Sequence, residues 1–422
     1  MTRRIAREVV GLGLVLIIAV AAAEFAHLFR EMILGSVEFF YGGRNATESI
    51  TTVDRILPAA LIVGGIFFAR VMNNAAHSWQ PGRLGIEAIA HSAQGIPPGA
   101  SLRGTLVRAV GTLAACMPGT SLGRESAILE SGGALGCFVG RRTGINGPAL
   151  ASAGVASAFA AAYHAPFGAV AYVGGHLGVW RDRRAISYAV IGALFSDWLS
   201  VTHLGGHPVF PGTQDSVGAL IVLGLIAIVP AFVGARTFVQ LREMLPEWSV
   251  VKEHPRLTLV VAVALSAGVV IWAPLTAGNG MEALRHVAVG GSIAAAVAMG
   301  VGKMIATSAT LHAKAPGGVF SPTLAVAAGW VLAVYVALQS AGIDLPGTLW
   351  GGIIIGMSVG VAVGLHSPLM AAVVVAEMCG QIGLIPFTAA AAFIAHRMVH
   401  VVNRFDSSRN AHVPHEMHEE DA

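Results

Sequence analysis

The sequence predicts an all-α membrane protein with many spans, in which broken helices form an inverted repeat. Its mean hydropathy is +0.70, and 55% of its residues are hydrophobic while only 12% are charged. The apolar runs lack the alternation of a membrane β-barrel, and backbone groups in lipid must pair within their own segment, so helices are expected. Gly or Pro interrupts many runs before the ~20 residues that a span needs, which predicts discontinuous helices.

The first apolar run, residues 9–23, follows three arginines among the first seven residues. The positive-inside rule predicts that this run is the first span and that its basic end is cytoplasmic. The alternative is a signal peptide, because the "AVAAAE" that ends the run resembles a cleavage site. The same rule places two further basic segments, 181–184 and 236–256, in the cytoplasm.

Net charge and cysteine content give two narrower expectations. The net charge of +3 comes from Lys and Arg in the expected loops, so it indicates topology and not nucleic-acid binding. The three cysteines, Cys116, Cys137 and Cys379, lie in apolar surroundings without metal-ligand spacing. We expect them to be packing residues, and we expect no metal site.

Two pairs of segments resemble each other in the same order along the chain. Residues 164–176, HAPFGAVAYVGGH, resemble residues 366–378, HSPLMAAVVVAEM, and residues 123–127 can be aligned with 318–322. Broken membrane helices often recur in two halves of inverted topology, so the chain is expected to contain two such halves. Chance similarity between apolar segments is the alternative.

The expected division of the chain follows from this alignment. Residues 1–205 form the first half of the transmembrane domain, residues 206–403 form the second half, and residues 404–422 form a short polar cytoplasmic tail. The tail contains His412, His415 and His418. These histidines could hold a metal, but a solvated tail is the favoured interpretation.

Three Gly-rich stretches, 93–101, 119–129 and 317–326, each precede a helical run. Pro suits the first helical turn and Gly permits the bends before it, so we expect helix N-termini here. A helix N-terminus presents unpaired backbone N–H groups and the positive end of the macrodipole, and several that converge near the bilayer midplane would bind an anion. The alternative is a set of kinks in packed helices.

Five segments resemble motifs of the CLC family of chloride channels and chloride/proton antiporters. Residues 123–127, GRESA, resemble its GREGP motif; 317–322, GGVFSP, resemble GxFxP; and 93–99, AQGIPPG, resemble GSGIP. Residues 161–169 and 365–378 resemble its paired AP-containing helices. The resemblance implies a multi-pass protein of a bacterial inner membrane that transports chloride without a cofactor, as a homodimer with one pore in each subunit.

The resemblance also implies a role for individual residues. Glu125 falls at the family's gating glutamate, whose carboxylate blocks an anion site when ionised and swings away when protonated. A structural ion pair with Arg124 is the alternative. The implied anion-binding residues are Val319 and Phe320 at the central site, Arg124, Glu125 and Ser321 at the outer site, and Gln94, Gly95 and Ile96 in the GSGIP-like segment.

Three positions depart from the family's pattern. Gln94 replaces the serine of GSGIP, which predicts a bulkier gate or an altered anion preference. The tyrosine that the family usually supplies near the C-terminus has no counterpart in residues 402–410, so a different inner coordination is expected. His176 stands where proton-coupled members commonly carry an internal glutamate, and it is either a proton relay or a structural residue.

The expected function is CLC-type chloride transport, gated by a glutamate and coupled to proton exchange. The alternatives within the family are a passive anion channel and a transporter for another anion. A cation or metabolite transporter would need carboxylates or carbonyl rings on its path. An intramembrane enzyme would rest on His164, His176, His366 and Glu377, whose spacing matches neither a zinc site nor a nucleophile–base set, so we expect no enzyme. Glu377 and Glu130 are expected to be structural carboxylates.

Overall fold

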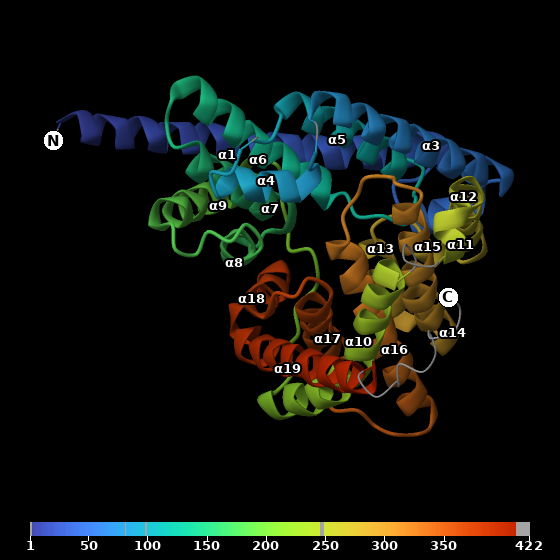
Figure 1. The fold of residues 1–422 in the computed structure, drawn as a ribbon. Coiled ribbons are helices and arrows are strands. Elements are labelled where there is room, and N and C mark those ends of the chain that lie inside the picture. Colours follow the sequence, from blue (N-terminus) through green and yellow to red (C-terminus); the bar gives the residue numbers. More distant parts are fainter. Residues whose placement is uncertain (1, 81, 98, 245–248, 411–422) are drawn as a thin grey trace, which may run out of the picture.

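The computed structural model describes residues 2–80, 82–97, 99–244 and 249–410 (Figure 1). The histidines of the tail lie outside the described residues. Within these ranges the chain is helical and contains no β-strand. The helices are α1 Thr2–Tyr41, α2 Ala46–Ser49, α3 Ile56–Trp79, α4 Gly85–Ala93, α5 Leu102–Cys116, α6 Glu125–Thr143, α7 Gly147–Tyr163, α8 Pro166–His176, α9 Arg183–His203, α10 Val217–Met244, α11 Ser249–Glu253, α12 Pro255–Trp272, α13 Met281–Gly290, α14 Ile293–Val297, α15 Lys303–His312, α16 Phe320–Ser340, α17 Leu349–Gly364, α18 Pro368–Met378 and α19 Ile385–Asn410.

The helices confirm the predicted fold class. Among the described residues, eight helical stretches are long and apolar enough to cross a membrane, and shorter apolar helices such as α17 and α18 accompany them. Residues 2–41 form one continuous helix, so the first apolar run is part of a long helix as the favoured interpretation expected. The short helices agree with the prediction of discontinuous segments.

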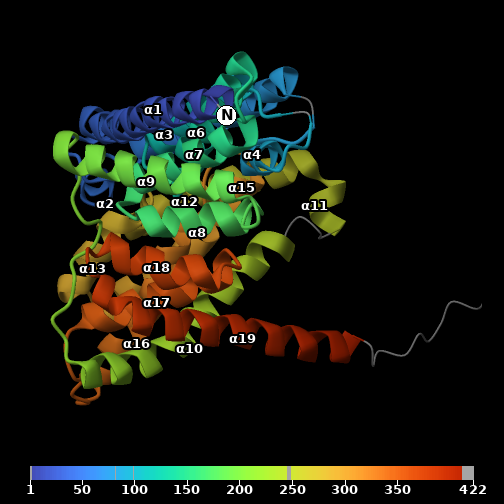
Figure 2. The same cartoon turned by 90° about the vertical axis from the view of Figure 1, so that its left-hand side faces the viewer.

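The helices form two layers. In Figure 1 the blue and green helices of the N-terminal part, among them α1 and α3–α9, lie above the orange and red helices α16–α19. Helices α8 and α18 meet where the layers join (Figure 2), and a Cβ on Gly168 would lie 2.9 Å from Cα of Val374. The two layers are therefore in backbone contact at their centre.

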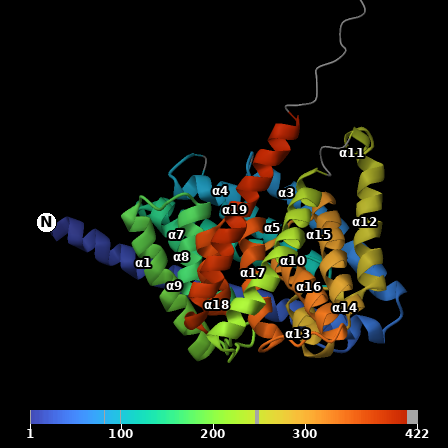
Figure 3. The same cartoon turned by 90° about the horizontal axis from the view of Figure 1, so that it is seen from below.

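Basic residues mark one face of the bundle, which we call the inner face. Arg7 and Arg184 line the same shallow cavity beside Asn146, and Arg184 forms an ion pair with Glu8. Arg7 and Arg184, from two of the predicted basic segments, thus lie together, as the positive-inside rule predicts. Helix α11 and the C-terminal end of α19 extend on this side (Figures 2 and 3).

The aligned segments of the two halves adopt matching conformations. Helices α8 and α18 have eleven residues each, and each follows a histidine with a left-handed backbone, φ 53° at His164 and 52° at His366. Gly123 and Gly318, which the alignment pairs, form an antiparallel bridge with N···O distances of 3.0 and 2.7 Å. The inverted repeat therefore accounts for the sequence alignment, while the boundary at residue 205 stays a prediction.

Close packing of α6 on α7 positions the start of α6. A Cβ on Gly132 would lie 2.3 Å from the carbonyl oxygen of Gly154, and one on Gly136 would lie 2.1 Å from that of Leu150, so glycine is required at both positions. Such stripes of small residues let membrane helices approach closely. Because the short turn 144–146 makes the two helices antiparallel, the first residue of α6 lies near the last residue of α7.

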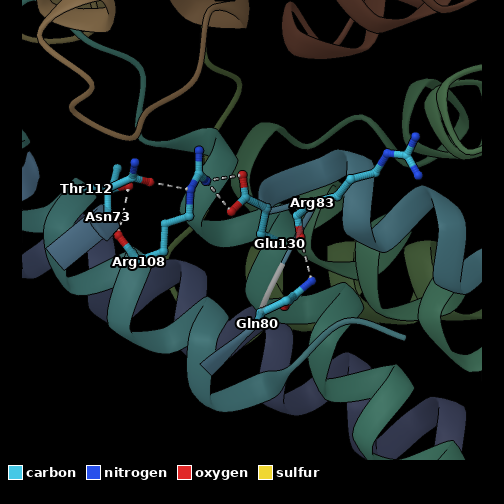
Figure 4. A network of polar contacts seen from close by, with 6 residues as sticks. All are labelled: Asn73, Gln80, Arg83, Arg108, Thr112 and Glu130. Carbon is cyan, nitrogen blue, oxygen red and sulfur yellow. Dashed lines mark hydrogen bonds and ion pairs between the residues drawn. The ribbon is translucent and has the colours of Figure 1, made fainter. Parts of the chain in front are cut away.

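Glu130 is a structural carboxylate, as expected. Its two oxygens accept hydrogen bonds from Arg108 Nη1 at 2.9 and 2.6 Å, and Arg108 Nε donates to Asn73 Oδ1 at 3.1 Å (Figure 4). The Glu130 side chain is only 4% exposed. The ion pair joins α6 to α5. It gives the buried Glu130 carboxylate a cation that contacts both of its oxygens.

Glu377 also has structural partners, since its carboxylate accepts from the backbone N–H groups of Phe167 at 3.0 Å and Gly168 at 2.7 Å. A C-terminal residue of α18 therefore caps the start of α8, where unpaired donors and the helix dipole favour a negative charge. The three cysteines are buried and free, in agreement with a packing role.

Replacing Arg108 with Met is expected to lower the free energy of unfolding by about 3–5 kcal/mol, because it leaves the Glu130 carboxylate buried without its cation. Thermal unfolding in detergent measures this loss. The double variant Arg108→Met/Glu130→Met should recover much of it. Arg83→Met, which breaks the exposed ion pair with Glu87, should cost at most about 1 kcal/mol. Equal losses in the two single variants would contradict the assignment.

Candidate anion site

Glu125 is the first residue of α6, and its carboxylate reaches the N-terminus of α16. Its Oε1 accepts from the backbone N–H of Ser321 at 3.1 Å, and its Oε2 accepts from the Ser321 hydroxyl at 3.2 Å. Glu125 is 4% exposed. The carboxylate therefore occupies a place that a helix N-terminus offers to an anion.

Two glycines make room for this carboxylate. A Cβ on Gly123 would lie 2.1 Å from Glu125 Oε1, and one on Gly318 would lie 2.3 Å from the carboxyl carbon. These are the residues that bridge the two halves, so the carboxylate lies directly against the paired loops. The GRESA and GGVFSP segments thus meet in space, as their common resemblance to anion-binding motifs required.

Tyr163 completes the contacts of Glu125, although the sequence motifs did not single it out. Its hydroxyl lies 3.3 Å from Glu125 Oε2 and 2.9 Å from Ser321 Oγ, and the residue is 3% exposed. Its ring packs edge-on against Phe320, with the centroids 4.9 Å apart. The signal that could have found it is the hairpin of α6 and α7, whose similar lengths of 19 and 17 residues place Tyr163 opposite Glu125.

Arg124, Val319 and Phe320 are also predicted to bind the anion near Glu125. None of the ion pairs among the described residues joins Arg124 to Glu125, so the alternative of a structural pair finds no support in the geometry. The backbone N–H groups of Val319 and Phe320 begin α16 and form no hydrogen bond within the described part of the chain. Such donors are available to an anion.

A cavity of about 260 Å³, which we call the outer cavity, leads from the face opposite the inner face to Arg124 and Tyr163. Its lining includes the ends of α1 and α9. Four arginines, Arg30, Arg44, Arg124 and Arg285, line its wall together with one carboxylate, Glu282, and the histidines His27, His164 and His207. A recess lined by one sign of charge concentrates ions of the opposite sign, so this cavity favours anions.

Lys303 is a second residue that the sequence motifs did not indicate. It is fully buried, and its Nζ donates to the carbonyl oxygen of Thr276 at 2.9 Å and to that of Gly278. The N–H of Gly278 in turn donates to Gly119 O at 2.8 Å, at the start of the loop that leads to Glu125. Lys303 thereby holds this loop through hydrogen bonds to its carbonyl oxygens.

The predicted donors Gln94, Gly95 and Ile96 lie elsewhere than expected. They follow the C-terminus of α4, and their backbone N–H groups donate to Ala90, Ser92 and His91 of that helix. The Gln94 side chain donates to Leu177 O at 2.9 Å. In this conformation the three N–H groups are engaged, because the stretch 93–101 first closes one helix before α5 begins at Leu102.

His176 lies at the end of α8 toward the inner face, next to the residue that Gln94 contacts. Its ring stacks on Tyr172 with a centroid distance of 4.4 Å, and its Nδ1 is buried without a hydrogen-bond partner among the described residues. Tyr172 contacts Phe159, which contacts Tyr163, with centroids 5.5 and 5.2 Å apart. A continuous row of aromatic rings therefore leads from His176 to the hydroxyl beside Glu125.

Known proteins resemble the chain over most of its length. The family described as "Voltage gated chloride channel" matches residues 59–400. A curated relative, the voltage-gated ClC-type chloride channel ClcB of Citrobacter koseri, is 27% identical over 307 residues, which cover 67% of this chain and 69% of the relative.

Solved structures share the fold. A slow cyanobacterial Cl⁻/H⁺ antiporter matches with a TM-score of 0.74 and 18% identity, covering 92% of this chain and 94% of the other. A CLC-type fluoride/proton antiporter matches with a TM-score of 0.70 and 18% identity, covering 92% and 95%. These structures support the fold, and the match over residues 59–400 assigns the family: this chain belongs to the voltage gated chloride channels, the CLC family.

Proposed function

We propose that this CLC-type anion transporter carries chloride across a bacterial inner membrane and that Glu125 is its gate. The observation that carries the proposal is the position of the Glu125 carboxylate at the N-terminus of α16, on the N–H and hydroxyl of Ser321. An ionised carboxylate there competes with a free anion for the same donors. A protonated carboxyl loses its charge and with it the advantage over chloride.

Exchange of chloride for protons follows from this gate if the proton on Glu125 can reach the inner face. His176 is the proposed relay, because it ends α8 toward the inner face and has a ring nitrogen without a partner among the described residues. Imidazole exchanges protons near neutral pH. The similarity to a slow Cl⁻/H⁺ antiporter favours exchange over a passive channel.

The proposed assembly is a homodimer with one pore in each subunit, and the transport cycle uses no cofactor. The support for both is membership of the family together with the broken helices, which enclose the site within one chain. Fluoride is the second candidate substrate, since a structural neighbour is a fluoride/proton antiporter and hydroxyl donors surround Glu125.

Glu125→Ala is expected to abolish proton movement and leave chloride flux, because the site keeps its donors but loses its titratable competitor. Glu125→Gln should behave similarly, with a lower chloride flux because the neutral side chain still fills the site. Both fluxes are recorded together in liposomes that contain the purified protein. Glu87→Gln, the same chemical change at an exposed position, should leave both fluxes unchanged. Wild-type proton coupling in Glu125→Ala would show that the gate is wrong.

His176→Gln is expected to reduce proton flux by about a hundredfold, the usual effect of removing a positioned proton-transfer group, while chloride flux persists. The reversal potential under opposing chloride and proton gradients should then move to the chloride equilibrium potential. His77→Gln, at an exposed histidine of α3, is the control. A reversal potential that still follows the pH gradient in His176→Gln would exclude the relay.

Gln94→Ser is expected to change the ranking of chloride, nitrate, bromide and fluoride by roughly fivefold, the equivalent of one hydrogen bond of about 1 kcal/mol. The shorter serine side chain cannot reach Leu177 O. The variant therefore loses the hydrogen bond between residue 94 and Leu177 and carries the hydroxyl of the family's motif instead. Competition between the anions in the flux assay measures the ranking. Identical profiles for wild type and variant would eliminate Gln94 as a selectivity residue.

A further inference from the structure

We propose that Tyr163 is a ligand of the transported anion: its hydroxyl, with that of Ser321, donates to the anion that replaces the Glu125 carboxylate. The inference rests on the proposed function and extends it to a residue outside the motifs. Here the hydroxyl comes from the end of α7, in the first half of the chain.

With the Glu125 carboxylate on Ser321, the two hydroxyls cannot supply a proton to every contact between them and the carboxylate. Three contacts join Tyr163, Ser321 and Glu125: the tyrosine and serine hydroxyls lie 2.9 Å apart, and they lie 3.3 and 3.2 Å from Glu125 Oε2. Two hydroxyls supply only two protons for these three contacts. One of the three contacts therefore lacks a proton: either both hydroxyls donate to Glu125 Oε2, or one donates to the other and a single O–H proton is left for the carboxylate.

Removal of the carboxylate releases these donors in one place. The Ser321 N–H, the Ser321 hydroxyl and the Tyr163 hydroxyl would then face the vacated volume, which Gly123 and Gly318 keep free of side chains. Buried donors without acceptors are costly, so an anion that takes all three is stabilised. The outer cavity reaches Tyr163 and Arg124, which gives an anion access to this position.

A comparison with Tyr172 separates this role from packing. Both tyrosines are buried and both rings contact Phe159, at centroid distances of 5.2 and 5.5 Å. The Tyr172 hydroxyl forms no hydrogen bond among the described residues, whereas the Tyr163 hydroxyl lies on the anion site. Tyr172→Phe is therefore a control for Tyr163→Phe, because each removes one tyrosine hydroxyl from the same aromatic cluster.

The test uses the Glu125→Ala background, in which a free anion can occupy the place of the carboxylate. Chloride binding is measured by isothermal titration calorimetry on the purified full chain. Adding Tyr163→Phe should weaken chloride at least roughly tenfold, as expected for a lost hydrogen bond to a charged group. Adding Tyr172→Phe should leave the affinity within about twofold of the background. Adding Ser321→Ala should weaken chloride as well, which gives a second variant if Tyr163→Phe does not fold.

Each outcome decides the assignment. Equal affinities of Glu125→Ala and Glu125→Ala/Tyr163→Phe would overturn the role of Tyr163 and leave the gate intact. Equal losses from Tyr163→Phe and Tyr172→Phe would assign the effect to packing and also overturn it. Absence of chloride binding by both wild type and Glu125→Ala would instead contradict the proposed function, and the Tyr163 assignment would fall with it.

Discussion

The site depends on one constraint, the need of backbone donors at a helix start to find acceptors where water is excluded. The first N–H groups of an α-helix have no partner within the helix, and unpaired polar groups in a protein interior are costly. Helix α16 begins inside the bundle, against the bridged glycines 123 and 318. In this structure the Glu125 carboxylate, from the start of α6, accepts from one of these donors, the N–H of Ser321 in the first turn of α16.

Neither half of the chain builds this arrangement alone. Glu125 and Tyr163 come from the α6–α7 hairpin, while Ser321 is the second residue of α16, 196 residues after Glu125. Glycine contacts between α6 and α7 fix the first pair, and the bridge between the loops fixes the second half against them. Close backbone packing therefore fixes where the three residues meet.

The three buried carboxylates of this region differ in their partners. Arg108 neutralises Glu130 and the start of α8 holds Glu377, so each completes a contact within the scaffold. Glu125 also accepts from a helix start, but the cationic outer cavity reaches its neighbours Arg124 and Tyr163. A free anion can therefore approach the proposed gate Glu125 through this cavity, and this access distinguishes Glu125 from the helix cap Glu377. Lys303, in contrast, is held by the carbonyl oxygens of the neighbouring loop.

The sequence by itself determined the fold class, because hydropathy and Gly–Pro interruptions reflect the lipid environment of each segment separately. It also determined that the segments around Glu125 and Phe320 belong together, since the repeat and the motifs are local patterns. Tertiary structure decided the positions of Tyr163 and Lys303 and the contacts of Gln94. The hydroxyl of Tyr163 meets Ser321 across 158 residues, and Gln94 meets Leu177 across 83. Contacts between distant helix ends leave no period or motif in the sequence, so only the packing of the helices reveals them.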